Sequence, residues 1–461
     1  MKKVSFVLGA LVSVSGCVTD ELDGDDLELG TSSSELSFNK NRISNNFPML
    51  NTLGFSETFS TEGYVDLRNE FFDEFGTNDR TCGSCHKATE GWTINTLNTR
   101  ILFELTRGRD PLFRTNDGTN SPNADVSTLA ARRSAYSMLL TRGTIRVGIG
   151  MPANANFELV AVDDPYNFAS AAELSMFRRP LPATNLTAIP NVMWDGRVTG
   201  ATINDALKEQ ANGATQGHAA APNPLNDVTR QQIVDFETGL FNAQAFTWNI
   251  GMLDSQGAGG RAETLASQNI TFSTVIPTRD VRRWNLFDAW QNSSDPDRRA
   301  VFRGQELFNT RHHVVDANGN PRPEFTCTNC HTIQNFGSDM AGRFFNIIDT
   351  ATVPLRRAAD QPLYTFRYTG PPIVNAGGVV TTPTGAIVQI TDPGRALITG
   401  QWRDMGRFKV PAIRGLAARA PYFHDGSAPT LLEVVKMYEQ FQGFNFTAAE
   451  EADLVAFLSA L

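Results

Sequence analysis

Two short stretches of the chain carry the residue types and the spacing that attach a haem group covalently. They are Cys82-Gly-Ser-Cys85-His86 and Cys327-Thr-Asn-Cys330-His331, and each is a C-x-x-C-H motif. In this motif the two thiols add to the vinyl groups of the porphyrin, and the adjoining histidine binds the iron. The motifs use four of the five cysteines and predict two covalently bound c-type haems.

A single C-x-x-C has other meanings, namely a redox dithiol, a disulfide or half of a zinc site. A zinc ribbon needs two such pairs about 15–20 residues apart, whereas the first cysteines of these pairs are 245 positions apart. A redox dithiol needs no histidine directly after the second cysteine, and here that histidine occurs twice. Both facts favour haem attachment.

The N-terminus is typical of an exported bacterial lipoprotein. Lys2 and Lys3 precede an apolar run at residues 4–14 that is too short to span a bilayer. The sequence then reads Val14-Ser-Gly-Cys17, which is similar to a lipobox whose cysteine receives the lipid. We predict a lipoprotein signal at residues 1–17, with a plain secretory signal as the alternative. Residues 18–46 are acidic and serine-rich, and we expect them to form a disordered tether.

Export agrees with haem attachment, which takes place outside the cytoplasm in bacteria. We expect the protein on the periplasmic side of the cell envelope, attached to a membrane through lipid on Cys17. Val18, rather than aspartate, follows that cysteine and favours the outer membrane. The net charge of −9 argues against a nucleic-acid partner.

The rest of the chain divides into two halves that repeat one layout, with one haem motif in each half. Residues 65–75 have a helical apolar face before the first motif, and residues 301–308 repeat that pattern before the second. The capping boxes Thr229–Gln232 and Thr447–Glu450 open the last helix of each half.

Helix, haem loop, irregular crossover and final helix is the layout of a cytochrome c domain. We therefore predict a mainly α fold of two tandem cytochrome c-like domains with long loops, and one haem in each. The predicted boundaries are 47–252 for the N-terminal domain, 253–281 for a linker and 282–461 for the C-terminal domain, with a short hairpin within 365–391.

Several stretches resemble the bacterial dihaem cytochrome c peroxidase and MauG superfamily. The strongest are GRFKVPAIR at residues 406–414 and APYFHDGS at 420–427. In the first half, WDGR at 194–197 and EQA at 209–211 are similar to family motifs. The resemblance covers most of residues 64–461, with insertions at 109–175 and 309–325. It implies an enzyme whose N-terminal haem reacts with peroxide and whose C-terminal haem transfers electrons.

For the N-terminal haem, the resemblance implies that His86 binds the iron and that the sixth position is open. Many peroxidases of the family carry a blocking histidine about sixteen residues later, and Leu102 stands there in this chain. His218 is the other histidine of this half, and it can line the distal pocket, bind the iron or lie in a loop.

Glu209 of the EQA motif is the expected acid–base residue, because a carboxyl in an apolar pocket can take up and release a proton. A solvated glutamate on a surface helix is the alternative. About six extra residues separate it from Trp194 compared with the family, and Val192 stands where the family has a pocket glutamine. The expected catalytic tryptophan is Trp194; for the one that bridges the haems, Trp92, Trp194, Trp248, Trp284 and Trp290 are all candidates.

For the C-terminal haem, the family implies His331 as one iron ligand and a residue fourteen positions after the histidine of Y-F-H-D-G as the other. Counting from His424 gives Tyr438, with Met437 beside it. A capping box at 430–433 begins a helix, and Tyr438 lies on its apolar stripe whereas Met437 lies off it. We predict Tyr438 as the ligand, with Met437 as the alternative.

The family also holds calcium between its domains, on backbone carbonyls near A-P-Y-F-H and on an asparagine side chain. Pro421 is present, but the asparagine position falls in Arg178-Arg179-Pro180, which counts against calcium. His424 is expected to be structural or to lie near a haem propionate. The remaining expectations are propionate pairing by Arg407, Lys409 and Arg414 and a surface position for His312 and His313.

Together these features predict an oxidoreductase of the cytochrome c peroxidase type. Hydrogen peroxide is reduced at the N-terminal haem, with electrons passed through the C-terminal haem from a small cytochrome c or cupredoxin. One alternative, favoured by Tyr438 and by the missing histidine, is a MauG-like enzyme that uses a ferryl state to oxidise Trp or Tyr side chains of a partner protein. The second alternative is a non-catalytic dihaem electron carrier.

Overall fold

The computed structural model describes residues 41–461 except 271, 274–277, 312–324, 347–359 and 376. The predicted signal with Cys17 and nearly all of the tether lie outside the described residues, as do His312 and His313. Asn39–Leu461 form one compact unit. Within the described ranges, no helix is both long enough and apolar enough to span a bilayer.

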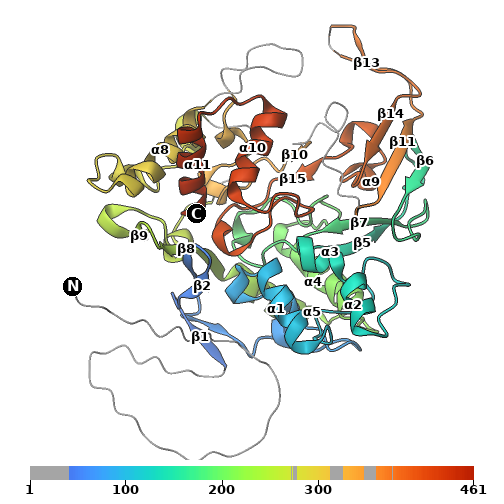
Figure 1. Ribbon diagram of the computed structural model, residues 1–461, viewed down its shortest axis with the longest axis horizontal. Helices are drawn as coiled ribbons and strands as arrows, with labels where there is room; N and C mark the ends of the chain where they lie inside the picture. The colour runs from blue at the N-terminus through green and yellow to red at the C-terminus, as the bar shows by residue number, and fades with distance from the viewer. Residues whose placement is uncertain (1–40, 271, 274–277, 312–324, 347–359, 376) are drawn as a thin grey trace, which may run out of the picture. The chain divides into compact units, whose positions relative to one another are not determined.

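The described chain contains eleven α-helices and fifteen strands, so a mainly α fold is not confirmed. Figure 1 labels many of them. The helices are α1 Thr96–Thr106, α2 Leu129–Ala135, α3 Ser137–Arg142, α4 Ile203–His218, α5 Asp227–Thr238, α6 Ala262–Ala266, α7 Arg279–Arg282, α8 Pro296–Thr310, α9 Ala396–Thr399, α10 Leu431–Gln442 and α11 Ala448–Ser459.

The strands form six small antiparallel sheets. They are β1 Arg42–Ser44 with β4 Tyr64–Asp66; β2 Met49–Asn51, β3 Gly54–Ser60, β8 Leu240–Thr247 and β9 Gly251–Met252; β5 Ile145–Ile149 with β7 Leu174–Arg178; β6 Phe157–Asp163, β11 Leu363–Tyr368 and β14 Ile387–Ile390; β10 Phe344–Phe345 with β15 Phe408–Lys409; and β12 Ile373–Val374 with β13 Val380–Thr382.

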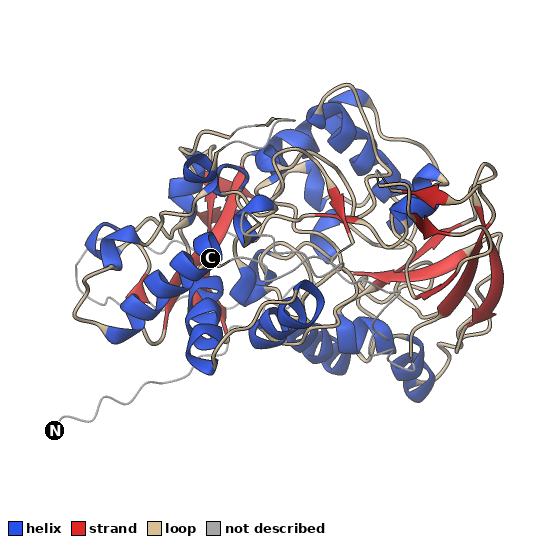
Figure 2. Cartoon of the chain, turned by 90° about the horizontal axis from the view of Figure 1, so that it is seen from above, coloured by secondary structure: helices blue, strands red, loops and turns tan. Residues whose placement is uncertain are grey.

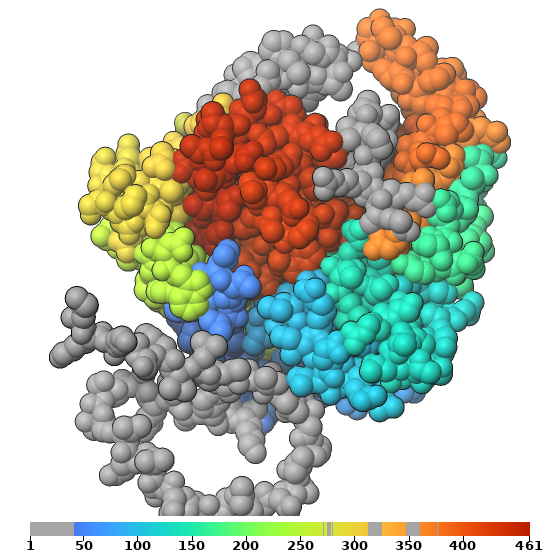
Figure 3. Space-filling model, in the orientation of Figure 1, coloured from blue at the N-terminus to red at the C-terminus, as the bar shows by residue number. Residues whose placement is uncertain are grey.

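One sheet joins the two halves of the chain. β11 and β14 pair as the hairpin that the sequence predicts, and β6 from the first half adds a third strand on the other edge of β11. In Figure 1, β11 and β14 in orange lie beside β6 in green, and orange and green atoms are in contact in Figure 3. The sheet lies at one end of the view in Figure 2. Phe157 at the start of β6 and Tyr364 and Phe366 of β11 are buried in the apolar cluster that the sheet helps to form. The two halves are thus fastened by shared backbone hydrogen bonds.

The C-terminal core forms where the sequence predicts helices. The apolar pattern at 301–308 lies in α8, and Thr447 and Glu450 make the predicted capping box of α11. The two helices approach closely at Gly304, where a Cβ atom would lie 1.9 Å from the main-chain oxygen of Asp453. Glycine is therefore required at this crossing.

Two predicted helix starts in the first half are wrong. Residues 65–75 form only a 3₁₀ turn, Glu70–Phe72, because Asn69 caps it and Asp73 returns to extended backbone. The pattern instead buries Phe71, whose ring centroid lies 5.1 Å from that of Phe236. α5 begins before the predicted box at Thr229, because the side chain of Asn226 accepts from the Thr229 amide and caps the helix earlier.

Candidate functional site

Both C-x-x-C-H motifs fold into the same turn. Cys82–Ser84 and Cys327–Asn329 are 3₁₀ turns, and the threonine before each has φ −114°. The amide of His86 donates to the oxygen of Cys82 at 2.9 Å, and that of His331 donates to the oxygen of Cys327 at 3.0 Å. In both places the chain therefore presents two thiols and an imidazole in the same relative arrangement.

The two histidines are also oriented in the same way. Nδ1 of His86 donates to the oxygen of Trp92 at 3.0 Å, and Nδ1 of His331 donates to the oxygen of Gly337 at 2.7 Å. Because a carbonyl only accepts, the proton sits on Nδ1 and the lone pair is on Nε2, as iron ligation requires. Burial lowers the pKa of both imidazoles and favours this neutral form.

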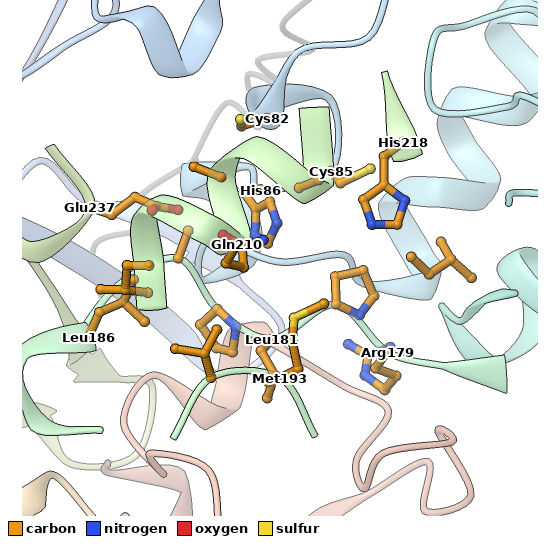
Figure 4. Close-up of a pocket in the computed structure, with 18 of the residues that line it drawn as sticks. Cys82, Cys85, His86, Arg179, Leu181, Leu186, Met193, Gln210, His218 and Glu237 are labelled. Atoms are coloured by element: carbon orange, nitrogen blue, oxygen red, sulfur yellow. The ribbon is translucent and has the colours of Figure 1, made fainter. Parts of the chain in front are cut away.

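The first motif opens into a pocket that we call cavity 1, lined by Cys82, Cys85 and His86. Figure 4 shows His86 pointing into this cavity, with Gln210 beside it. Leu181 and Met193 face it from the opposite wall. Glu237 lies on the flank near Cys82, and His218 lies on the flank near Cys85.

The second motif opens into cavity 2, lined by Cys327, Cys330, His331 and Tyr438. Nε2 of His331 and the hydroxyl of Tyr438 face each other at 3.4 Å. Burial raises the pKa of Tyr438. Met437 is not among the residues that line cavity 2, so the geometry favours Tyr438 over Met437 as the partner of His331 across the cavity.

A cationic wall separates the two cavities. Arg179, Lys409 and Arg419 line both of them. Burial lowers the pKa of Lys409 to about 7 and that of Arg419 to about 10. Within the described chain, Lys409 and Arg419 make no salt bridge, and Nε of Arg419 has no hydrogen-bond partner. Buried cations of this kind call for an anionic partner.

These observations test whether a c-type haem fits each cavity. Each cavity offers two thiols for attachment and a histidine Nε2 for iron, and the shared wall offers cations for the two propionate carboxylates that each haem carries. The residues fit the group.

Two of the expected propionate partners lie outside the cavities. Arg407 and Arg414 line neither cavity, so the propionate pairing expected of them is not supported. Arg407 is exposed, and Arg414 donates to the oxygen of Gly260. His424 lines cavity 2 and stacks on Phe408.

Trp194 is the tryptophan that lines both cavities. Its Nε1 donates to the oxygen of Arg179 at 2.8 Å, and its ring lies edge-on to His424 at 6.2 Å. The other candidates lie elsewhere: Trp92 donates to Thr58 behind His86, Trp284 donates to the oxygen of His331, Trp290 is in the C-terminal core and Trp248 is 59 % exposed.

Glu209 does not lie in cavity 1, which corrects the sequence-based expectation. Its side chain is 56 % exposed and pairs with Arg230 at 2.9 Å. α4 begins at Ile203, and Glu209 lies on the face of this helix that is turned toward Arg230 of α5. α4 instead presents to the cavity its residues Leu207, Gln210, Ala211, Ala214, Thr215 and His218.

Sequence reasoning missed a carboxyl that does line cavity 1. Glu237 is fully buried on α5, and burial raises its pKa to about 8. Its Oε2 has no hydrogen-bond partner among the described residues. The signal was available, because Glu237 continues the apolar stripe of Ile233 and Val234 on that helix.

His218 is held against cavity 1 by a buried ion pair. Its Nδ1 hydrogen-bonds Asp117, which also accepts from Arg80. Arg80 is fixed in turn by the oxygens of Pro111 and Leu112, at 2.8 and 2.7 Å. Burial opposes ionisation of Asp117, but Arg80 and His218 outweigh it and hold the pKa of Asp117 below its usual range. No sequence pattern signals this cluster, because Asp117 lies in the insertion at 109–175.

Leu102, which stands at the position of the family's blocking histidine, packs with Cys85 in an apolar cluster and does not line cavity 1. Across the described residues, no group of three or more His, Cys, Asp or Glu side chains is arranged to hold a metal ion.

The chain is similar to several characterised proteins, although no protein-family model matches it. It is 41 % identical over 75 residues to cytochrome c peroxidase Ccp of Escherichia coli, and 41 % identical over 69 residues to cytochrome c551 peroxidase of Nitrosomonas europaea. These matches span 16 % and 15 % of this chain, and only 16 % and 21 % of the length of those relatives.

A longer match joins 63 % of this chain to 70 % of the methylamine utilization protein MauG of Methylophilus methylotrophus, at 26 % identity over 305 residues. Among solved structures, a MauG-like protein associated with microbial copper homeostasis aligns with 78 % of this chain and 87 % of its own, with a TM-score of 0.33 and 17 % identity.

Proposed function

Because the chain belongs to the superfamily of bacterial dihaem cytochrome c peroxidases and MauG, we propose that it is a dihaem oxidoreductase that reduces hydrogen peroxide in cavity 1. The proposal rests on one difference between the cavities, which is the presence or absence of a side chain close to Nε2 of the motif histidine. Tyr438 stands 3.4 Å from Nε2 of His331, whereas no described residue hydrogen-bonds Nε2 of His86. Cavity 1 is thus the reactive site, and cavity 2 serves electron transfer.

A haem bound through Cys82, Cys85 and His86 supplies the metal that accepts peroxide and exchanges electrons with it. The chain supplies an apolar enclosure in which Leu181 and Met193 limit the space opposite His86. Tyr438 and His331 are the proposed ligands of the second haem, with Met437 as the weaker alternative. Trp194, between the cavities, is the proposed electron path.

Proton transfer in cavity 1 is assigned to His218 in place of Glu209. Asp117 accepts from Nδ1, so Nε2 is the nitrogen that takes a proton from peroxide and returns it to the departing oxygen. Arg80 also bonds Asp117 and balances the charge of that carboxylate. Reduction of one peroxide to two water molecules uses two protons and two electrons, and the electrons come from a small cytochrome c or a cupredoxin.

A second candidate function is supported by Tyr438. A phenolate ligand favours oxidised iron, and such a site suits an enzyme that, like MauG, passes oxidising equivalents to Trp or Tyr side chains of a partner protein. Peroxide is the oxidant in both candidates. A purely electron-carrying role is disfavoured by the missing hydrogen-bond partner at Nε2 of His86.

Electron paramagnetic resonance of the oxidised protein tests this proposal. We expect one high-spin and one low-spin ferric signal, and loss of the high-spin signal when peroxide is added. Two low-spin signals that resist peroxide would mean that Met193 or His218 fills the sixth position, and the carrier role would stand. Peroxide consumption with reduced cytochrome c, in the absence of any modified partner protein, then separates the peroxidase from the second candidate.

Replacing His218 with glutamine is expected to lower kcat/KM for peroxide about 100-fold or more, because the proton acceptor is lost. The resting spectrum is expected to stay unchanged, since His218 is not assigned as an iron ligand. Glu209→Gln on the same helix is the matched control and is expected to change the rate by less than about twofold, because an exposed ion pair contributes little. An unchanged rate in His218→Gln, or a larger loss in Glu209→Gln, would return the acid–base role to Glu209.

The domain boundaries at 47–252, 253–281 and 282–461, and periplasmic anchoring to the outer membrane through lipid on Cys17, remain proposals. Metabolic labelling with a radioactive fatty acid in wild type and Cys17→Ser tests the anchor.

A further inference from the structure

We propose that the guanidinium of Arg179 replaces the calcium ion that the family resemblance implies between the two halves, so that this protein has no calcium requirement.

Four main-chain oxygens surround this guanidinium. Nη2 donates to the oxygens of Ile94 at 2.5 Å and Arg419 at 2.9 Å. Nη1 donates to the oxygens of Arg142 at 3.0 Å and Gly143 at 3.5 Å. Arg419 directly precedes the A-P-Y-F-H segment, and the other three residues belong to the first half. One side chain therefore ties carbonyls from both halves, as a bound cation would.

The surroundings are shaped to the guanidinium. Arg179 is only 5 % exposed. Gly143 ends α3 with φ +62°, and a Cβ there would lie 2.3 Å from Nη1 of Arg179. The oxygens of Arg142 and Gly143 stand at the C-terminal end of that helix, where carbonyls lack partners within the helix and attract a positive charge. A smaller or uncharged side chain would leave these oxygens buried without donors.

Arg179 keeps its charge in this setting. Burial, followed by the neighbouring Arg419, lowers the pKa of Arg179 to about 10, which still leaves it protonated at neutral pH. The buried carboxyl of Glu90 acts in the opposite direction. The site thus holds one permanent positive charge that belongs to the chain itself.

A calcium ion does not fit beside this side chain. Calcium takes six to eight oxygen ligands, among them carboxylates, and here the carbonyls already accept N–H donors. Arg179 itself stands in the Arg178-Arg179-Pro180 segment, where the resemblance implies an asparagine ligand. The positive charges of Arg179 and Arg419 would also repel a second cation.

The first experiment uses the wild-type protein with both haems attached. We expect elemental analysis to find less than about 0.1 calcium per chain after gel filtration, and the thermal midpoint to be unchanged by excess EGTA. About one calcium per chain, or a lower midpoint in EGTA, would overturn the inference. This measurement needs no variant and no activity assay.

The second experiment converts the site. Arg179→Asn removes the cation and supplies an amide oxygen beside four carbonyl oxygens, so the variant is expected to bind one calcium ion and to gain at least about 2 °C in thermal midpoint with millimolar calcium. Arg132→Asn is the matched control, because Arg132 is also buried and donates only to main-chain oxygens, those of Arg107, Val126 and Ser127. It is expected to lose stability and to gain nothing from calcium.

The two variants are judged together. Calcium stabilisation of Arg179→Asn alone supports the inference. No calcium effect in Arg179→Asn, or an equal effect in both variants, contradicts it. If Arg179→Asn fails to accumulate, the calcium content and EGTA response of the wild-type protein still decide the matter.

Discussion

Replacing Cys82 and Cys85 together with alanine is expected to leave one covalently bound haem per chain and to lower peroxide reduction by about 1,000-fold or more. The two thiols line cavity 1 beside His86, and without them the haem of the reactive site is no longer fixed against that histidine. A pyridine haemochromogen assay counts the thioether-linked haems, and peroxide consumption with a reduced cytochrome gives the rate.

Cys327→Ala with Cys330→Ala is the matched variant at the other cavity. It is also expected to hold one haem, but cavity 1 still binds cyanide in the ferric state while electron supply from a donor protein fails. If the first double variant kept full activity and the second lost cyanide binding, the roles assigned to the cavities would be reversed. Two attached haems in either variant would remove the basis of the whole proposal.

Replacing Arg178 with methionine is expected to destabilise the protein by about 3–5 kcal/mol at neutral pH. Nε of Arg178 lies 2.6 Å from Asp392, and the same guanidinium bonds Asp195; all three side chains are buried. Without Arg178, Asp392 keeps no arginine or lysine partner among its described salt bridges, and Asp195 keeps only Arg197. The midpoint of urea unfolding measures the loss.

The same loss is expected to shrink at low pH. Burial would raise the pKa of Asp195 and of Asp392, but Arg178 outweighs burial and holds both below the usual range. Groups with a lowered pKa stabilise the folded state above the ordinary aspartate pKa, about 4, and lose that effect as the pH falls through their folded values. The gap between wild type and Arg178→Met should therefore narrow below about pH 4.

Arg133→Met is the control for this prediction. Arg133 pairs with Glu104 through its two terminal guanidinium nitrogens, Nη1 and Nη2, but the two side chains are 50 % and 57 % exposed. Its unfolding midpoint should shift far less than that of Arg178→Met. Equal shifts of the unfolding midpoint in the two variants would show that the buried ion pairs of Arg178 stabilise the protein no more than the exposed pair of Arg133 does.

The sequence predicted correctly those parts of the structure that are determined by residues close together in the chain. The turns of the two haem motifs depend on residues that lie within six positions of each other, and so do the capping boxes of α10 and α11. Tyr438 was placed correctly on the cavity-facing side of α10 because helical periodicity decides between it and Met437.

Prediction from the sequence failed where the position of a side chain depends on residues that are far away along the chain. Glu209 was expected in the cavity by a motif match, yet it pairs with Arg230 on the exposed side of α4, and the neighbouring Gln210 lines the cavity instead. Asp117 and His218 meet although they are 101 residues apart, and the carbonyls around Arg179 come from three separate segments. The hydrophobic periodicity of a segment does not indicate such contacts between residues that are far apart in the sequence.

The sheet that unites β6 with β11 has a consequence for how the protein is made. Glu158 on β6 and Arg367 on β11 are 209 residues apart and bond at 2.7 Å. As the chain emerges from its amino end, β6 is complete long before its partner strand has been synthesised, and an unpaired edge invites mispairing. The first half of the chain therefore exposes the edge of β6 until residues 363–368 have been synthesised.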